Sequence, residues 1–405
     1  MHALNQAATA DQTNFARLMI KRLEDKGWPT PVIYQADTFS LKLGEGHILY
    51  LDNTYTDWLS AEGAAAKQVA IDRLVDVTLD GRRQTTAEQD RANLMLGVRS
   101  RTYVENMWLF TKMPPDYMEG AYKPLIADLA AVLIIDSEKA MAICTREKLT
   151  EWGQSFDDLV PLARDHLKRV PTRLEKTGSG IYVSNGSGDY DTSALFTPDV
   201  FSSLPLKGRP VVVPVLRNLL LVAGSEDIEA LRQIGPLAEK LYDEDTRPLS
   251  LTPLILKDGV FTAVDTANGA FPMLRRLALR QPMQDYADVR LALEPHFATQ
   301  KRETYIGQLE AIESDDSLYT WTTLVYDIDS IIPKADAVII SQGDNAPPLV
   351  RHWADLMAVC GEVTTEPHVY PPLYAFPKGL DAGCIARLKQ DYLHPVWFPD
   401  LSKMA

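Results

Sequence analysis

The chain has 405 residues, of which 46% are hydrophobic and 24% charged, so it can build a sizeable core and is too long for one ordinary domain. Its 41 basic and 55 acidic residues give a net charge of −14, which repels nucleic acid and anionic membrane surfaces. The three cysteines, Cys144, Cys360 and Cys384, are widely spaced and form no CxxC motif, which argues against a disulfide framework or a zinc site. The first residues lack a signal-peptide pattern, and no apolar stretch reaches the ~18 residues of a membrane span, so we expect a cytoplasmic protein.

A helix, a hairpin and a second helix are expected in the first part of the chain. The segment from Thr13 to Pro29 has apolar residues at helical spacing behind a capping residue, Thr13 or Asn14. Residues 37–55 then alternate as two strands around Gly44 and Gly46, and an apolar helical pattern begins near Ser60.

The middle of the chain favours hairpins over regular alternation of strands and helices. A strand is expected within residues 93–105, and two more within 131–145, followed by a helix from a Ser155 cap. Asn185-Gly186 is typical of a two-residue hairpin, and Asp258-Gly259 predicts another. Between them, residues 209–227 read as two buried strands, after which Ser225 caps a helix. We therefore predict an α+β fold with mixed or antiparallel sheets.

Three regions follow from this pattern. Residues 1–265 form the first α+β region, with a division into two subdomains near 170–178 as an option. Residues 266–298 are helix-favouring and basic and read as a connection between modules. Residues 299–405 form a smaller α+β module with several strands, a turn at "IIPKAD", a helix over Val350–Cys360 and an extended, proline-punctuated stretch.

The first region resembles the uncharacterised bacterial YtpQ-like family, of unknown function. The likeness rests on "GVRSRTYVE" (97–105), "LIADLAAVLIIDSEKAMAICTREKLTEWG" (125–153), "SGDYDTSALF" (187–196), and "VVVPVLRNLLLVAG" with "LTPLILKDGVFTAV". It spans roughly Leu18 to Val264. The resemblance implies an α+β fold and a bacterial cytosolic setting. It implies no catalytic residues, and everything after about Asp265 is additional to the family pattern.

Asp189 and Asp191 are the first candidate site. Two carboxylates about 7 Å apart along an extended segment could hold Mg²⁺ or act as acid and base. The competing interpretation is that Asp189 completes a turn while Asp191 or Thr192 caps a short helix, and we favour it because no third metal ligand is identifiable nearby. The neighbouring glycine pairs lack the residues of a phosphate loop.

Arg99, at the end of a predicted strand, is the second candidate. An arginine there could bind a carboxylate or phosphate with two parallel hydrogen bonds, although an ordinary salt bridge is the more common role. The basic run "LRRLALR" from Leu274 could meet an acidic partner, but in so acidic a chain it is expected to pair with the protein's own carboxylates. Cys144 beside Arg146 could be an activated thiol, though burial at a strand end is expected.

Tyr370, Tyr374 and Phe376 lie among prolines near the end of the chain. Such a surface could anchor a protein partner, while the alternative is an irregular strand folded onto its own module.

The function expected from the sequence is recognition of a protein partner by a cytoplasmic bacterial protein with no catalysis of its own and no cofactor. The alternative is a metal-assisted hydrolase or phosphotransfer enzyme that uses Asp189 and Asp191 with Arg99 as an anion clamp. A third polar group converging on the aspartates would favour the enzyme. Nucleic-acid binding is disfavoured by charge, and would require one exposed stripe of basic residues, namely Arg275, Arg276, Arg280, Arg290, Lys301 and Arg302.

Overall fold

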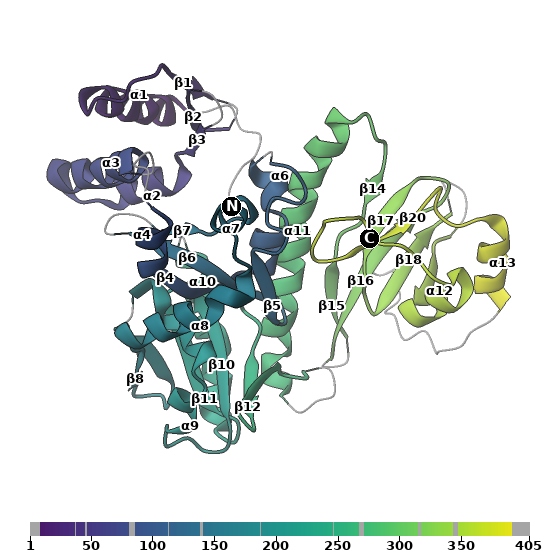
Figure 1. Cartoon of the computed structure of the whole chain (residues 1–405). Helices are drawn as coiled ribbons and strands as arrows, with labels where there is room; N and C mark the ends of the chain where they lie inside the picture. The colour runs from purple at the N-terminus through teal and green to yellow at the C-terminus, as the bar shows by residue number, and fades with distance from the viewer. Residues whose placement is uncertain are drawn as a thin grey trace. The chain divides into compact units, whose positions relative to one another are not determined.

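The fold is α+β, as the sequence predicts (Figure 1). The computed structural model describes residues 9–390, except residues 37, 45–46, 81–85, 112, 138–140, 187, 246, 267–270, 315–316 and 343–346. Contacts divide the chain into two compact units, which are described separately. Unit 1 takes in residues 1–96, 133–144 and 159–166, and unit 2 takes in residues 97–132, 145–158 and 167–405. In the described residues, no helix has both the length and the apolar character needed to cross a membrane.

Unit 1 begins with a helix that starts earlier than predicted. Helix α1 (Ala10–Asp25) is capped by Thr9, whose hydroxyl accepts the Gln12 N–H while the Gln12 side chain accepts the Thr9 N–H. This reciprocal capping satisfies two N–H groups at once, which explains why the predicted caps, Thr13 and Asn14, were wrong.

The rest of unit 1 is a small sheet with helices around one apolar core. Strands β1 (Val32–Gln35), β2 (Ser40–Leu43) and β3 (His47–Tyr50) pair antiparallel, and the helices are α2 (Asp52–Ser60), α3 (Gly63–Asp80) and α4 (Ala87–Ala92). The predicted hairpin is confirmed, and residues 45–46 of its turn lie outside the described residues. Phe15, Met19 and Leu23 of α1 are buried in this core. Arg22 of α1 pairs with Asp72 of α3 at 2.5 Å, and Lys26, the residue after α1, pairs with Asp76 at 2.5 Å and with Asp72 at 3.6 Å.

Three elements have residues in both units: strand β4 (Leu94–Ser100), which is divided after Leu96, and the strand and helix described next. The second part of β6 (Leu129–Asp136) pairs with β7 (Met141–Ile143) in unit 1, and its first part pairs with β5 (Tyr122–Ile126) in unit 2. Helix α8 (Phe156–His166) starts in unit 2, where the Ser155 hydroxyl accepts the Asp158 N–H at 3.3 Å. The predicted cap is therefore confirmed. Strand β4 (Leu94–Ser100) and helices α5 (Arg101–Glu105), α6 (Met107–Thr111) and α7 (Arg146–Trp152) complete this stretch.

A six-stranded antiparallel sheet forms the centre of unit 2. Its order is β13-β12-β10-β11-β9-β8, and the strands are β8 (Arg173–Lys176), β9 (Tyr182–Asn185), β10 (Pro210–Leu216), β11 (Leu219–Gly224), β12 (Leu254–Lys257) and β13 (Val260–Ala263). The hairpin at Asp258-Gly259 is confirmed, since Lys257 pairs with Val260.

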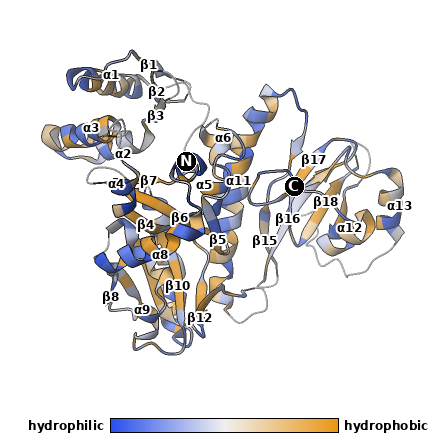
Figure 2. Cartoon of the chain, in the orientation of Figure 1, coloured by the Kyte–Doolittle hydropathy of each residue, from blue (hydrophilic) through white to orange (hydrophobic). Residues whose placement is uncertain are grey.

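Both faces of this sheet are buried, which explains its almost continuous apolar strands (Figure 2). Val211 and Val213 of β10 belong to one core with helix α10 (Ile228–Glu244). Val212 and Val222 belong to a second core with residues of the 3-10 helix η2 (Gly188–Phe196) and helix α9 (Asp199–Ser202). Successive side chains of a strand point to opposite faces, so the run "VVVPV" supplies both cores at once.

Two local predictions in this region were wrong. No hairpin forms at Asn185-Gly186, because β9 already pairs with β8 and β11 and the chain leaves Asn185 for η2. Helix α10 is capped by Asp227, whose carboxylate accepts the Ala230 N–H at 3.4 Å. The Ser225 hydroxyl instead accepts the Arg209 N–H at 2.9 Å and is occupied by the neighbouring strand.

The remainder of unit 2 is a long helix and two further sheets. After η1 (Leu167–Arg169) and η3 (Pro272–Leu274) come α11 (Arg275–Thr299), β14 (Tyr305–Ile306), β15 (Glu310–Ser314), β16 (Ser317–Val325), β17 (Ser330–Pro333), β18 (Ala337–Ser341), β19 (Leu349–His352), α12 (Trp353–Cys360), β20 (Leu373–Phe376) and α13 (Ala382–Gln390). Their sheet orders are β14-β17-β20 and β15-β16-β18-β19, with parallel pairs β14–β17 and β16–β18. The predicted turn at "IIPKAD" is confirmed only for residues 334–336, which connect β17 to β18, because Ile331, Ile332 and Pro333 belong to a buried strand between two partners.

Helix α11 occupies most of the range predicted to connect two modules. Its Val289 and Leu293 pack with Ile331 and Leu373 of the following sheet. At its other end, Leu277 joins the core of the six-stranded sheet. The helix therefore contributes to two cores, and the division of the chain at residues 265 and 298 stays a prediction.

Candidate functional site

Three arginines and one aspartate from four separate segments of unit 2 lie within one electrostatic neighbourhood. Arg99 ends β4, Arg217 lies in the turn between β10 and β11, Arg247 follows α10, and Asp189 lies in η2. The charge of Arg217 acts on Arg99, and the charges of Asp189 and Arg247 act on Arg217. We call these four residues the arginine cluster.

Hydrogen bonds to backbone carbonyls hold the segments of the cluster together. The Arg217 N–H donates to the Arg247 carbonyl at 3.2 Å, and the Thr192 hydroxyl donates to the Arg217 carbonyl at 2.9 Å. The turn exists because β10 and β11 are apolar and pair from Leu216 to Leu219, which leaves only Arg217 and Asn218 to reverse the chain.

The guanidinium of Arg99 is buried and has little local compensation. Arg99 is 7% exposed, and its Nη1 donates to the carbonyl of Val98 at 2.8 Å. Burial, and next the charge of Arg217, lower the pKa of Arg99 to about 10, and burial also lowers the pKa of Arg217. Both side chains remain cationic at neutral pH. Among the described residues, neither forms an ion pair with a carboxylate.

The one ion pair of the cluster lies nearer the solvent. Arg247 Nη1 is 2.9 Å from Asp189 Oδ1, and the two side chains are 41% and 31% exposed. Asp245, whose carboxylate accepts the Arg247 N–H at 2.8 Å, is a second nearby acid. Three cations therefore face two carboxylates, and the cluster carries excess positive charge.

This arrangement is suited to binding an anion. Guanidinium groups bind carboxylates and phosphates through paired hydrogen bonds and are the usual residues for such ligands. A bound anion would offset the repulsion between Arg99 and Arg217. Tyr103, which is 43% exposed, acts electrostatically on both arginines.

The structure thus brings Arg99 and Asp189 together, while Asp191 has a different environment. Asp191 is 3% exposed within η2, and its carbonyl accepts the Thr172 hydroxyl at 3.4 Å. Within the described part of the chain, no group of three or more histidine, cysteine, aspartate or glutamate residues could hold a metal ion. The carboxylate of Asp189 meets arginines, where a metal site would need further acidic or histidine ligands.

Tyr370, Tyr374 and Phe376 lie in another part of unit 2 and pack against the chain itself. Arg101 stacks over the Tyr370 ring at 3.9 Å, and the Asn106 side chain bonds both the N–H and the carbonyl of Tyr370. Tyr374 packs edge-on against Trp353 at 4.9 Å, and Phe376 is 4% exposed in the core.

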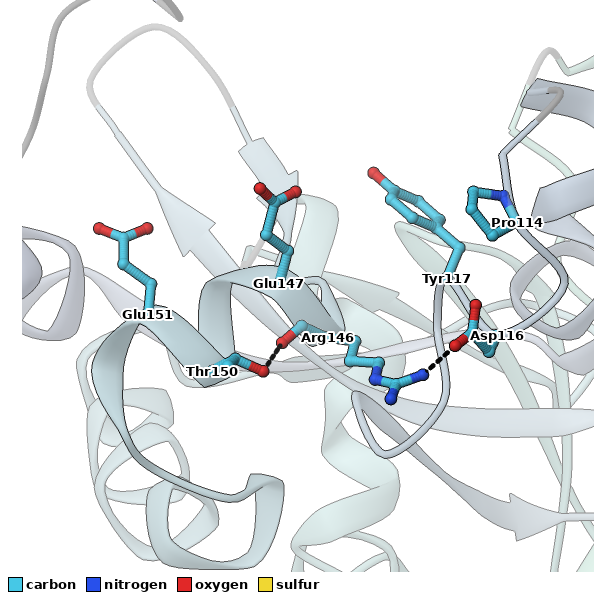
Figure 3. Close-up of a pocket in the computed structure, with 7 residues that line it drawn as sticks. All are labelled: Pro114, Asp116, Tyr117, Arg146, Glu147, Thr150 and Glu151. Carbon is cyan, nitrogen blue, oxygen red and sulfur yellow. Dashed lines mark hydrogen bonds and ion pairs between the residues drawn. The ribbon is translucent and has the colours of Figure 1, made fainter.

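An open pocket of about 550 Å³ lies between the 114–117 segment and α7 (Figure 3). Asp116, Glu147 and Glu151 give it an acidic character, and Arg146 forms ion pairs with Asp116 and, at 3.4 Å, with Glu119. Among the described residues that line this pocket, Arg146 is the one cation, and it already has carboxylate partners, so these residues offer no comparable anion site. Cys144, which was considered as a thiol activated by Arg146, is 1% exposed, as the alternative interpretation of a buried cysteine expects.

Five arginines of α11 and the segment after it are paired with the protein's own acids. The pairs are Arg275–Asp336 at 3.8 Å, Arg276–Glu239 at 3.6 Å, Arg280 with Glu239 and Asp243, Arg290–Glu294 at 2.7 Å, and Arg302–Glu366 at 2.6 Å. The expected internal pairing of the "LRRLALR" run is therefore confirmed.

Sequence reasoning missed Arg217 and Arg247. A single cation between two wholly apolar strands was a usable signal for Arg217, because charged residues seldom interrupt such a run without a role. Arg247 carries no comparable signal, since only the path of the chain after α10 brings it to Asp189.

Comparisons with protein-family models, with curated proteins and with solved structures found no match to this chain. The resemblance to the YtpQ-like family stays a prediction.

Proposed function

We propose that this chain is a recognition protein without catalysis of its own, and that the arginine cluster binds an anionic group, a carboxylate or a phosphate, on a protein partner. One observation carries the proposal: within the described residues, the buried guanidinium of Arg99 and the half-buried guanidinium of Arg217 act on each other electrostatically, and neither forms an ion pair with a carboxylate. A buried charge without a counter-charge destabilises a fold, so a bound anion is the natural complement. A cytoplasmic, bacterial setting belongs to the same proposal.

The geometry supports this function better than the metal-assisted enzyme. That alternative assigns Asp189 and Asp191 to a metal, but Asp189 pairs with Arg247 and Asp191 is buried in η2. A phosphotransfer or hydrolytic site would also need a nucleophile or base directed at the substrate. The arginines of the cluster and the nearby Tyr103 therefore favour binding of an anion over catalysis on it.

The test is affinity capture from the native host with quantitative mass spectrometry. The bait is the full chain, as wild type, as the Arg99→Gln/Arg217→Gln variant and as the control Arg276→Gln, whose side chain is 82% exposed. The proposal predicts a partner that is retained by the wild type and Arg276→Gln, lost by the double variant, and released by millimolar inorganic phosphate. Equal recovery of every protein by all three baits would contradict it.

A further inference from the structure

Two cysteines meet at the junction of two helices in the C-terminal part of unit 2. Cys360 is the last residue of α12, and Cys384 lies in the first turn of α13. Both are unbridged, half-buried and packed against the same hydrophobic core. Arg387 contacts both the Cys384 sulfur and the carbonyl of the residue before Cys360, and the Cys384 thiol acts electrostatically on the Cys360 thiol, so the two side chains lie close together although 23 residues separate them in sequence.

The surroundings hold the two sulfur atoms in place. Arg387 Nη2 donates to Cys384 Sγ at 3.4 Å and to the carbonyl of Val359 at 3.1 Å, so it bridges Cys384 and the residue before Cys360. The Asp381 carboxylate accepts the Cys384 N–H at 2.6 Å, which fixes the start of α13.

The two thiols have different chemical settings. Burial, and next the neighbouring Cys384, raise the pKa of Cys360 to about 12, so Cys360 stays protonated at neutral pH. Cys384 has a guanidinium at its sulfur and lies at a helix N-terminus. Cys384 is therefore suited to attack, and Cys360 to close the bond.

We propose that Cys360 and Cys384 form a redox-sensitive dithiol, which a hydroperoxide converts to a disulfide linking α12 to α13. In the first step the Cys384 sulfur gives up its thiol proton and attacks one oxygen of the peroxide to become a sulfenic acid, while the O–O bond breaks and the departing hydroxide takes that proton and leaves as water. In the second step the Cys360 sulfur displaces the sulfenic hydroxyl, the S–S bond forms, and the thiol proton leaves with the hydroxyl as a second water. Overall, the two thiols together lose two electrons, and one molecule of hydrogen peroxide is reduced to two molecules of water.

The test is stoichiometric hydrogen peroxide on the reduced full-length protein, followed by alkylation under denaturing conditions and mass spectrometry. The expected result is loss of two of the three alkylatable thiols, a cross-linked peptide pair containing Cys360 and Cys384, and recovery of both thiols with dithiothreitol. Cys144→Ser should behave as the wild type, because Cys144 is buried in unit 1. Cys360→Ser should instead stop at a sulfenic acid on Cys384, which dimedone traps.

Three results would overturn the proposal: retention of all three thiols, a dimedone-trapped sulfenic acid in the wild type with no cross-link, or a disulfide that joins two chains. Thermal melts of each variant in the reduced state show whether it is folded. A misfolded serine variant does not obscure the outcome, because the cross-linked peptide of the wild type is decisive by itself.

Discussion

Arg247 Nη1 lies 2.9 Å from Oδ1 of Asp189, which precedes it by 58 residues. The pair occupies the solvent side of the arginine cluster, with both side chains partly exposed. If the cluster binds an anion as proposed, the carboxylate of Asp189 and that anion compete for interaction with the same guanidinium groups.

Asp189→Asn should strengthen anion binding. The substitution removes the competing charge and leaves Arg247 without its partner. A partly exposed ion pair contributes about 0.2–1 kcal/mol, so the affinity for inorganic phosphate should rise by up to about fivefold, as measured by calorimetric titration at constant ionic strength.

The matched control is Asp243→Asn, which removes an acid that pairs with Arg280 outside the cluster. It should leave phosphate affinity unchanged. If Asp189 were a metal ligand, Asp189→Asn would instead remove stabilisation by millimolar Mg²⁺ or Mn²⁺, so a metal-dependent rise in Tm that this variant abolishes would refute our assignment of Asp189.

Elements with local signals were predictable from the sequence, and those set by distant contacts were not. The β12–β13 hairpin follows from Asp258-Gly259, and the Ser155 cap follows from its place before an apolar helix. Asn185-Gly186 carries an equally strong local signal, yet β9 is already paired on both sides. The pairing of β9 with β8 and β11, and not the local turn signal, therefore determined the structure at Asn185-Gly186.

The candidate site was predictable only in part, for a similar reason. Arg99 and Asp189 stood out individually, but their relation depends on Arg217 and Arg247, which reach them through backbone contacts between remote segments. Periodicity and turn signals describe neighbours in the chain, so they carry no information about such convergence.

Asp285→Asn should stabilise the protein at mildly alkaline pH. Burial, and next the charge of Asp128, raise the pKa of Asp285 well above its usual range, and burial raises the pKa of Asp128. The folded state then binds more protons than the unfolded state, so stability falls as pH rises from about 4 toward the raised pKa. Asparagine has the same shape and no charge, and it still accepts the Gln281 side-chain N–H seen at 3.0 Å.

Thermal melts at about pH 5 and about pH 8 measure this effect. The Tm difference between Asp285→Asn and the wild type should be larger at the higher pH. Glu362→Gln, at an exposed position, serves as the control and should show no such change. A gain that is equal at both pH values would contradict the predicted protonation of the buried carboxyl.

Leu293→Ala in α11 should be strongly destabilising, whereas Leu291→Ala in the same helix should not. Leu293 is 1% exposed in the core and Leu291 is 51% exposed. Removing a buried leucine side chain costs about 2–5 kcal/mol, and an exposed substitution usually stays within about 0.5 kcal/mol. Urea denaturation gives both values, and similar values for the two variants would show that α11 is not packed as described.

Gly224→Ala should destabilise the six-stranded sheet. A Cβ at Gly224 would clash with the backbone of Lys207, which cannot move as a flexible side chain does. The cost of such overpacking is about 1–3 kcal/mol. At Gly178 a Cβ meets nothing within 4 Å, so Gly178→Ala is the control and should be neutral or slightly stabilising in the same measurement.

Arg217→Gln tests most directly whether the arginine cluster is an anion site. Phosphate titration of the wild type, Arg217→Gln and Arg276→Gln, each paired with a thermal melt, separates binding from folding. We expect at least about a tenfold loss of phosphate affinity in Arg217→Gln only, with a Tm at or above that of the wild type, because the substitution removes a half-buried cation that has no carboxylate partner among the described residues. Equal phosphate affinity in all three proteins, or a wild type that binds no phosphate while Arg217→Gln melts at a lower temperature, would contradict it and make Arg217 a structural residue.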